Sequence, residues 1–232
     1  MKKQKSKPTP KLKTREITII LLCIFVPMIL GILSKDLLIG WPLLSTGLLA
    51  SYIASLRRRS NYILGAINAL LLAYAALKNN LFGSFFVDIF IFAPLEIVGF
   101  FLWGRNLDSD KNVKIRKFNT SLSIMVTSAC TLSSIVMGYL LTKIPTQQFA
   151  FLDSTICCID ICVAILMMLR FRETWWLGVI SGVLSVILWG IIQFEGGAGA
   201  TIRLLSATGY LVINLYGAIK WNILLNKKKT KR

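Results

Sequence analysis

Residues 175–194 read WWLGVISGVLSVILWGIIQF, an unbroken run of 20 residues without a charged side chain. About 20 apolar residues in an α-helix span the hydrocarbon core of a bilayer, and a helix satisfies its own backbone hydrogen bonds there. Runs of similar length recur along the chain, with short polar gaps between them. We therefore predict an all-α integral membrane protein with eight spans, over residues 17–34, 37–56, 62–78, 83–103, 120–142, 149–169, 175–194 and 204–225.

The composition of the 232-residue chain agrees with this interpretation. Hydrophobic residues make up 55% and charged residues only 16%, with a mean hydropathy of +0.68, whereas a soluble domain needs far more polar surface. The formal net charge of +17 comes from basic residues in the gaps and tails. No folded basic domain is left to bind a nucleic acid, and we expect the basic tails, residues 1–16 and 226–232, to meet anionic lipid headgroups instead.

The first apolar run, residues 17–34, follows a basic tail, as the apolar region of a signal peptide does. No small-residue cleavage site accompanies the run, because Pro27 and Gly31 do not form one. We expect this run to be retained as an extra N-terminal transmembrane helix.

The basic residues alternate between gaps. Every second gap is basic, and these gaps hold Arg57, Arg58, Arg59, Arg105, Lys111, Lys114, Arg116, Lys117, Arg170 and Arg172. The alternate gaps hold only Lys35, Lys78, Lys143 and Arg203. Because cytoplasmic loops carry an excess of Lys and Arg, we predict a multi-pass protein of the bacterial cytoplasmic (inner) membrane with both termini in the cytoplasm.

Two stretches of the chain share a pattern. Residues 94–103 and 212–221 each contain a polar residue, a glycine three residues later and a tryptophan four residues after that. These members are Glu96, Gly99 and Trp103 in the first stretch, and Asn214, Gly217 and Trp221 in the second. Such spacings return to one helix face, and glycine permits close helix contact in lipid. The alternative to a repeat is coincidence, since Gly and Trp are common near helix ends.

The topology favours the repeat, because the spans of residues 37–104 and of residues 149–225 run in the same directions across the membrane. We predict two parallel three-helix bundles over these two ranges, joined by a linker helix at residues 120–142. Transporters built from parallel repeats place their site between the halves.

Polar residues inside the predicted spans are candidates for a substrate site, because such residues are expensive in a membrane. The candidates are Glu96, Asn214, Asp160, Asn68, Tyr74, Asp88, Gln193 and Trp189. Aromatic faces attract cations and stack on rings, and carboxylates accept hydrogen bonds from hydroxyl groups. The pattern suits a flat, polar ligand, and it leaves open whether this ligand is a cation. The alternatives are packing for Tyr74 and Tyr210 and anchoring at the membrane interface for Trp103, Trp189 and Trp221. We favour the anchoring role for Trp103 and Trp221.

Other function classes have little support in the sequence. The chain has five cysteines, all inside apolar runs, and no histidine, so we expect small packing residues and neither a metal nor a cofactor. No HExxH, GxSxG or GxxxxGK motif is present. An intramembrane aspartyl enzyme that uses Asp88 and Asp160 and a structural or regulatory membrane protein remain as alternatives, and the sequence leaves open whether copies form a homo-oligomer.

At these residues the sequence resembles the PnuC family of vitamin transporters, known for nicotinamide riboside uptake and often labelled nicotinamide mononucleotide transporters. The resemblance covers most of residues 41–225, and the stretches that carry it are residues 65–74, 78–83, 94–103, 152–153, 170–175, 185–189 and 214–221. It implies a fold like that of the sugar-transporting SWEETs, in a three-one-three arrangement. It also implies facilitated diffusion of an unphosphorylated, nucleoside-like vitamin that a cytosolic kinase then traps.

The sequence departs from the family pattern at several positions. The family's Trp-x-x-x-Asn falls on Gly178 and Gly182, and its Tyr-Gly-Asp on residues 82–84 (Phe-Gly-Ser). Glu96 stands where the family usually has Gln, and Asp88 stands where it usually has Asn. Two lost site residues and two gained carboxylates suggest another ligand of the same class, such as thiamine or a deoxynucleoside.

Overall fold

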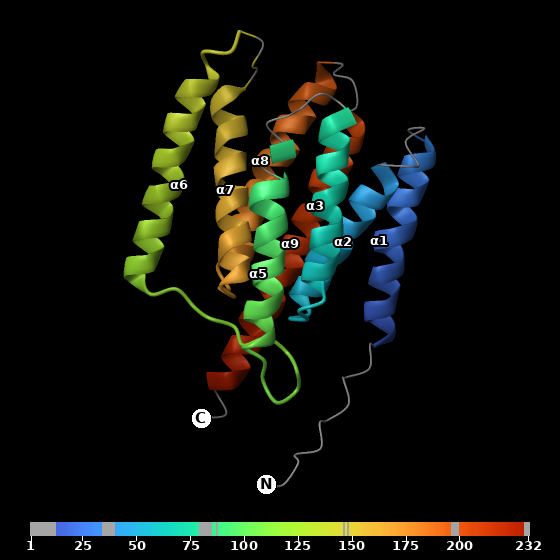
Figure 1. Cartoon of the computed structure of the whole chain (residues 1–232), viewed down its shortest axis with the longest axis vertical. Coiled ribbons are helices and arrows are strands. Elements are labelled where there is room, and N and C mark those ends of the chain that lie inside the picture. The colour runs from blue at the N-terminus through green and yellow to red at the C-terminus, as the bar shows by residue number, and fades with distance from the viewer. Residues whose placement is uncertain are drawn as a thin grey trace. The chain divides into compact units, whose positions relative to one another are not determined.

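The computed structural model describes residues 13–33, 40–78, 85–86, 88–145, 147, 149–195 and 200–229. These residues form an all-helical fold (Figure 1), which confirms the predicted fold class. The elements are α1 (Thr14–Leu33), α2 (Gly40–Ser55), α3 (Asn61–Lys78), η1 (Asp88–Phe92), α5 (Ala93–Gly104), α6 (Thr120–Leu141), α7 (Ala150–Met168), α8 (Thr174–Phe194) and α9 (Ala200–Lys229). Within the described ranges, β structure is limited to two isolated bridges, Leu107 with Val113 and Arg116 with Phe171.

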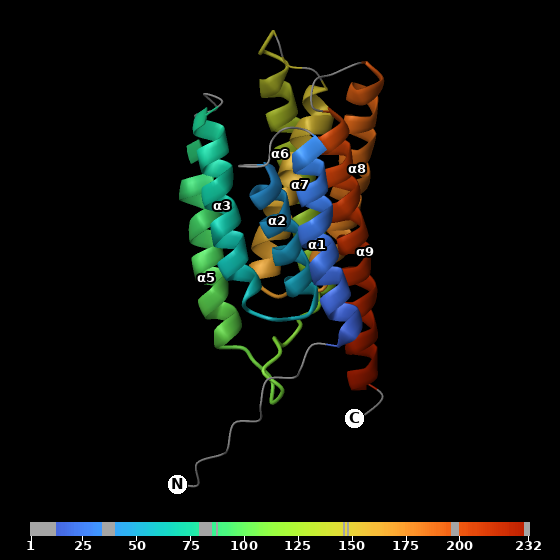
Figure 2. The same cartoon turned by 90° about the vertical axis from the view of Figure 1, so that its right-hand side faces the viewer.

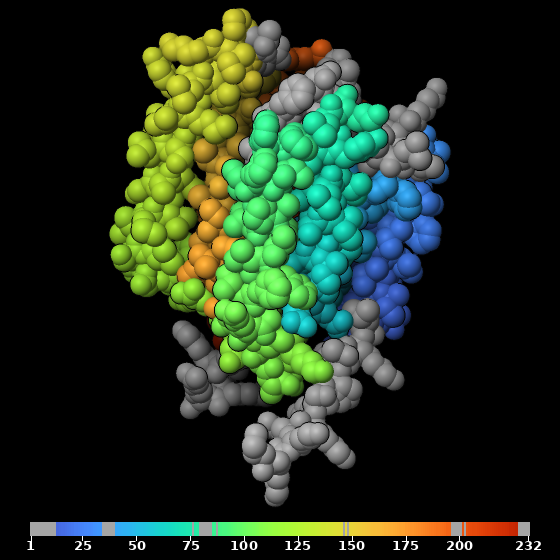
Figure 3. All heavy atoms as spheres, in the orientation of Figure 1, coloured from blue at the N-terminus to red at the C-terminus, as the bar shows by residue number. Residues whose placement is uncertain are grey.

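Each of the eight ranges that we expected to span the membrane contains one α-helix. In the part of the chain that the structure describes, α1, α6, α7 and α8 are long and apolar enough to cross a membrane by length and composition. The large apolar side chains of α6 face outward along its whole length (yellow-green in Figure 3). Such a helix is stable only where lipid surrounds it.

The expected span over residues 83–103 differs most from the observed helix. From Asp88 it forms a five-residue π-helical turn, η1, and continues as α5 with Pro94 in the first helical turn. Proline has no backbone N–H to donate and crowds the preceding turn. A π turn before the proline absorbs this mismatch, and such turns occur often at functional sites.

The chain divides into two compact units, Met1–Lys114 and Ile115–Arg232. In the first unit, α1 packs on α2, α2 on α3, and α3 on η1 and α5. In the second, α6 packs on α7, α7 on α8, and α8 on α9. Figures 1 and 2 both show α3 beside α5, and Figure 2 shows α8 beside α9 over most of their length. The helix that we expected to link two bundles, α6, thus belongs to the second unit.

The same turn connects α2 to α3 and α7 to α8. Each turn contains an arginine in the left-handed backbone region, Arg57 with φ 61° and Arg170 with φ 68°, four residues before the next helix begins. In the first unit, the carbonyl of Arg57 accepts a hydrogen bond from Val113 N at 3.1 Å. In the second unit, the carbonyl of Arg170 accepts one from Arg116 N at 2.8 Å. A left-handed residue after a helix satisfies the last carbonyls and reverses the chain, so both units make their basic turn in one way.

Candidate functional site

In the first unit, α3 and α5 pack closely through two glycines. The ring of Tyr62 occupies the space beside Gly99, where an added Cβ would overlap it. The carboxylate of Glu96 occupies the corresponding space beside Gly65. The ring of Tyr62 also meets that of Trp103 edge to face, with centroids 5.0 Å apart. Glycine removes the side chain that would hold two helices apart, so these residues come together because Gly65 and Gly99 allow it.

In the second unit, α8 and α9 repeat this arrangement. The ring of Trp175 lies against Gly217, and its centroid is 5.6 Å from that of Trp221 in an edge-to-face pair. The side chain of Asn214 lies against Gly178, where an added Cβ would be 2.8 Å from Asn214 Cγ. Asn214 Nδ2 donates a hydrogen bond of 2.9 Å to the Gly178 carbonyl. With Asn214 in this position, the tryptophan that the family resemblance implies at Gly178 would overlap the Asn214 side chain.

The structure therefore extends the repeat to a second pair of helices. An aromatic residue with glycine three positions later occurs in α3 (Tyr62, Gly65) and in α8 (Trp175, Gly178). In each unit, this aromatic–glycine pair faces the polar residue and the glycine of the polar–glycine–tryptophan stripe on the neighbouring helix. The sequence patterns described above do not include this half of the repeat, although its equal spacing from the arginine turns is a signal for it.

The two tryptophans of the repeat correct a prediction. We expected Trp103 and Trp221 to anchor their helices at the membrane interface, but both are 0% exposed. Trp103 lies against the ring of Tyr62, and Trp221 lies against the ring of Trp175. Because an indole ring suits a protein interior as well as a membrane interface, the sequence position alone did not distinguish the two.

A polar layer crosses the first unit beside these contacts. Asn68, one helical turn after Gly65, donates from Nδ2 to the Leu43 carbonyl at 2.6 Å and to Thr46 Oγ1 at 3.0 Å. The amide group of Asn68 thus ties α3 to α2 through its Nδ2. Within the described part of the chain its amide oxygen has no donor, so it can accept a hydrogen bond from a ligand. Glu96 is half-buried, and among the described residues its carboxylate has no hydrogen-bond or ion-pair partner.

The second unit has an equivalent polar layer. Ser181, one helical turn after Gly178, is buried and donates from Oγ to Asp160 Oδ1 at 2.5 Å, which ties α8 to α7. The side chain of Asp160 is otherwise exposed on the surface of α7. Where Glu96 presents an unpaired carboxylate in the first unit, Asn214 presents an amide that is already bonded. The two layers therefore share their positions and each holds one carboxylate, but the carboxylate of Asp160 is hydrogen-bonded and, in the described chain, that of Glu96 is not.

The remaining candidates lie outside these layers. Trp189 and Gln193 lie toward the far end of α8, and Gln193 is about 18 Å along the helix from Ser181 at 1.5 Å per residue. They contact the start of α9, with Arg203 Cζ 5.5 Å from the Trp189 ring centroid and Thr201 Oγ1 donating to Gln193 Oε1 at 2.7 Å.

In the first unit, two more candidates also lie apart from the layer. Tyr74 is 48% exposed, with Lys78 Nζ 5.7 Å from its ring centroid. Asp88 is 8% exposed within η1. Residues 82–84, where the family's Tyr-Gly-Asp was expected, lie outside the described residues.

The described residues contain no group of three or more His, Cys, Asp or Glu side chains that could hold a metal ion. A cavity of about 220 Å³ lies between α6 and α7 of the second unit.

Apolar helices that carry a few polar residues in layers define a polytopic membrane protein of the transporter class. The chain belongs to the nicotinamide mononucleotide transporter family, whose model matches residues 37–223. It is similar to the nicotinamide riboside transporter PnuC of Neisseria mucosa, with 27% identity over 191 residues that cover 78% of this chain and 71% of the relative. The corresponding protein of Haemophilus influenzae is 27% identical over 185 residues, covering 78% of each chain. That of Escherichia coli is 25% identical over 170 residues, covering 62% of this chain and 71% of the relative.

The fold also resembles a solved structure. The crystal structure of the vitamin B3 transporter PnuC superposes with a TM-score of 0.77, covers 94% of each chain and is 23% identical. The match of the family model confirms the family resemblance predicted from the sequence, and the structural similarity confirms the integral membrane helical fold.

Proposed function

We propose that this chain mediates facilitated uptake of a nucleoside-like vitamin through a cavity between its two repeated helix bundles. Nicotinamide riboside is the first candidate, because the similar proteins of Neisseria mucosa and Haemophilus influenzae are named as transporters of it. Family membership supports the transport activity. The polar layers, one in each unit, supply groups that suit the ribose hydroxyls of such a ligand.

The unpaired carboxylate of Glu96 is the feature from which we rank the candidate ligands. A carboxylate in a low-dielectric site is stabilised by a cationic partner. The pyridinium ring of nicotinamide riboside and the thiazolium ring of thiamine both carry a positive charge, whereas a deoxynucleoside is neutral. Nicotinamide mononucleotide adds a phosphate that the Glu96 carboxylate would repel. We therefore rank nicotinamide riboside and thiamine above deoxynucleosides and above the mononucleotide.

Uptake by the purified chain in liposomes tests the proposal. Labelled nicotinamide riboside, thiamine, thymidine and nicotinamide mononucleotide are supplied one at a time, with empty liposomes as the control. We expect saturable uptake of a cationic ligand that stops when the internal and external concentrations are equal. Accumulation beyond that level would contradict facilitated diffusion, and uptake of none of the four would contradict the transport function.

We propose further that both termini lie in the cytoplasm of a bacterial cell whose inner membrane holds the chain. The basic loop after α5, which includes Arg105, Lys111 and Lys114, supports this orientation. A cytosolic kinase would then meet the carried vitamin as it enters and trap it by phosphorylation. Reporter fusions at residue 110 check the orientation: a fluorescent protein should mature there, and an active periplasmic phosphatase at this position would contradict it.

A further inference from the structure

Two thiols on neighbouring helices of the second unit lie in contact. Cys130 Sγ on α6 is 2.9 Å from Cys162 Sγ on α7, and both cysteines are free. The S–S bond of a disulfide is about 2.05 Å long. The sulfur atoms therefore need to approach by only about 0.9 Å to bond.

The two cysteines belong to the contact that holds α6 in place. The buried residues of α6 are Cys130, Ser134 and Gly138, each four positions from the next, so they form one stripe of small residues. Gly138 lies against the ring of Phe151, and Ser154 Oγ donates to the Ser134 carbonyl at 3.0 Å. Because the rest of α6 is largely exposed, this stripe carries most of the packing between α6 and its unit.

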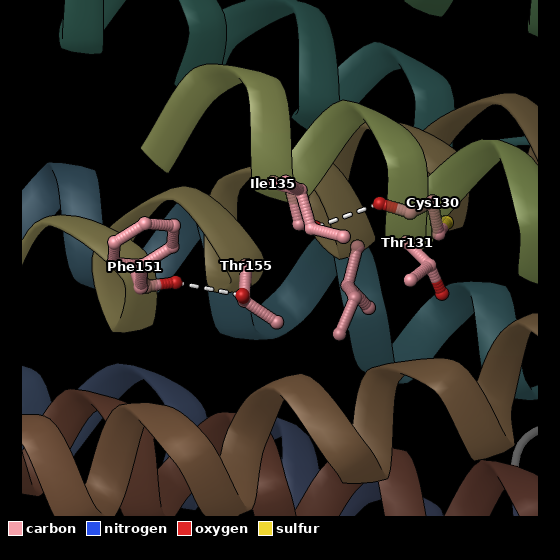
Figure 4. Close-up of a pocket in the computed structure, with 7 residues that line it drawn as sticks. Cys130, Thr131, Ile135, Phe151 and Thr155 are labelled. Carbon is pink, nitrogen blue, oxygen red and sulfur yellow. Dashed lines mark hydrogen bonds between the residues drawn. The ribbon is translucent and has the colours of Figure 1, made fainter. Parts of the chain in front are cut away.

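A cavity open to the surface lies beside Cys130. It has a volume of about 220 Å³, and its lining residues are Cys130, Thr131, Ser134, Ile135, Phe151, Thr155 and Ile159. Figure 4 shows Thr155 bonded back to its own helix, and the hydroxyls of Ser134 and Thr155 both donate to backbone carbonyls four residues earlier. The cavity wall is therefore mainly apolar, and a small uncharged oxidant can enter it.

We propose that Cys130 and Cys162 form a redox modification site, at which a hydroperoxide converts the two thiols into a disulfide that ties α6 to α7. One sulfur attacks the peroxide oxygen, the O–O bond breaks, an alcohol leaves, and a sulfenic acid remains. The second sulfur then attacks the sulfenic sulfur, and water leaves as the S–S bond forms. Two thiols lose two electrons and two protons, and the hydroperoxide is reduced to an alcohol and water.

The other cysteines are poorer partners. Cys157 and Cys158 are adjacent in α7, where helical geometry points their side chains in different directions. Cys158 lies one helical turn before Cys162 and is the nearest competitor for Cys130. Cys23 belongs to α1, in the first unit. The observed sulfur contact selects Cys162 over these alternatives.

The experiment uses the purified full chain in lipid nanodiscs, treated with tert-butyl hydroperoxide and then denatured and labelled with a maleimide. We expect the number of labelled thiols to fall from the five of the sequence by two, the mass spectrum to map a Cys130–Cys162 peptide pair, and a reductant to restore all labelling. Cys158→Ser is the matched control and should still lose two labelled thiols.

The variants Cys130→Ser and Cys162→Ser should each lose no labelled thiols on oxidation. Serine suits position 130 because Ser134 already lies in the same stripe of small residues. The midpoint of thermal unfolding should rise by a few degrees on oxidation of the unmodified chain and stay unchanged in Cys162→Ser. Retention of all five reactive thiols, or a disulfide mapped to Cys158, would overturn the proposal. The test does not depend on which ligand the chain carries, so it stands or fails separately from the transport function.

Discussion

The ring of Trp175 meets the ring of Trp221 edge to face, with the two centroids 5.6 Å apart. In the other unit, Tyr62 and Trp103 make the same kind of contact at 5.0 Å. In both units a glycine lies beside the first ring of the pair. The two units thus use one packing solution, even though one has tyrosine where the other has tryptophan.

Replacing Gly217 with alanine should destabilise the second unit. The added Cβ would overlap the ring of Trp175, which is 1% exposed and has no space to move into. Overpacking of a closely packed contact costs about 1–3 kcal/mol, and we expect Gly217→Ala to lower the free energy of unfolding by this amount. A denaturant titration in mixed micelles measures the change.

Gly190→Ala is the matched control for this substitution. Gly190 lies in the neighbouring helix α8, and an added Cβ there meets no atom within 4 Å. Alanine favours the helix over glycine by up to about 1 kcal/mol, so Gly190→Ala should be neutral or slightly stabilising. Equal losses of stability in both variants would show that close packing at Gly217 is not the cause.

Glu96→Gln should discriminate between ligands by charge. Glutamine keeps the shape of the side chain but removes the charge, so a cation loses its partner while a neutral ligand does not. We expect uptake of nicotinamide riboside to fall roughly tenfold, equivalent to about 1.4 kcal/mol, and uptake of any neutral nucleoside to stay the same. Initial rates in liposomes measure both.

Glu195→Gln provides the control for Glu96→Gln. Glu195 is an exposed carboxylate just after α8, so its substitution should leave both rates unchanged. If Glu96→Gln slows cationic and neutral ligands alike, the carboxylate does not select by charge.

The hydrogen bond between Ser181 and Asp160 should couple α7 to α8. Bonds to a charged acceptor contribute about 1.5–3 kcal/mol, and a double-mutant cycle isolates the pair. We expect Ser181→Ala and Asp160→Ala to show a coupling energy of about 1–2 kcal/mol in unfolding experiments. Asp160→Ala combined with Thr142→Ala, at the C-terminal end of α6, should be additive. Additive effects of the first pair would mean that the 2.5 Å contact contributes nothing to stability.

At the left-handed turn, the Arg170→Gly variant should be more stable than the Arg170→Val variant. A residue with a Cβ costs roughly 1–2 kcal/mol in this backbone region, and a β-branched residue is worse. Because Arg170→Gly and Arg170→Val both remove the arginine side chain, their difference reports the backbone alone. We expect the glycine variant to be more stable by about 1–2 kcal/mol.

The same pair of substitutions at Arg172 serves as the reference. Arg172 is not among the positive-φ residues of the described chain, so Arg172→Gly should have no advantage over Arg172→Val. A similar preference for glycine at both positions would mean that the strain does not arise from the φ of 68° at Arg170.

Two features of the chain followed from the sequence alone. An apolar run long enough to cross a bilayer is a local property, so every expected range coincides with a helix, and the bounds differ most for residues 83–103. The polar–glycine–tryptophan stripe was also visible, because its members lie within eight residues on one helix face.

The facing partners of that stripe were decided only by tertiary structure, as were the burial of Trp103 and Trp221 and the contact between Cys130 and Cys162. In a soluble protein, hydropathy separates the inner face of a helix from the outer one. In a membrane, lipid tails are as apolar as the protein interior, so hydropathy does not show which face is buried. That choice depends on how closely helices far apart in the chain can approach, and their glycines and small residues set this distance only once the helices are paired.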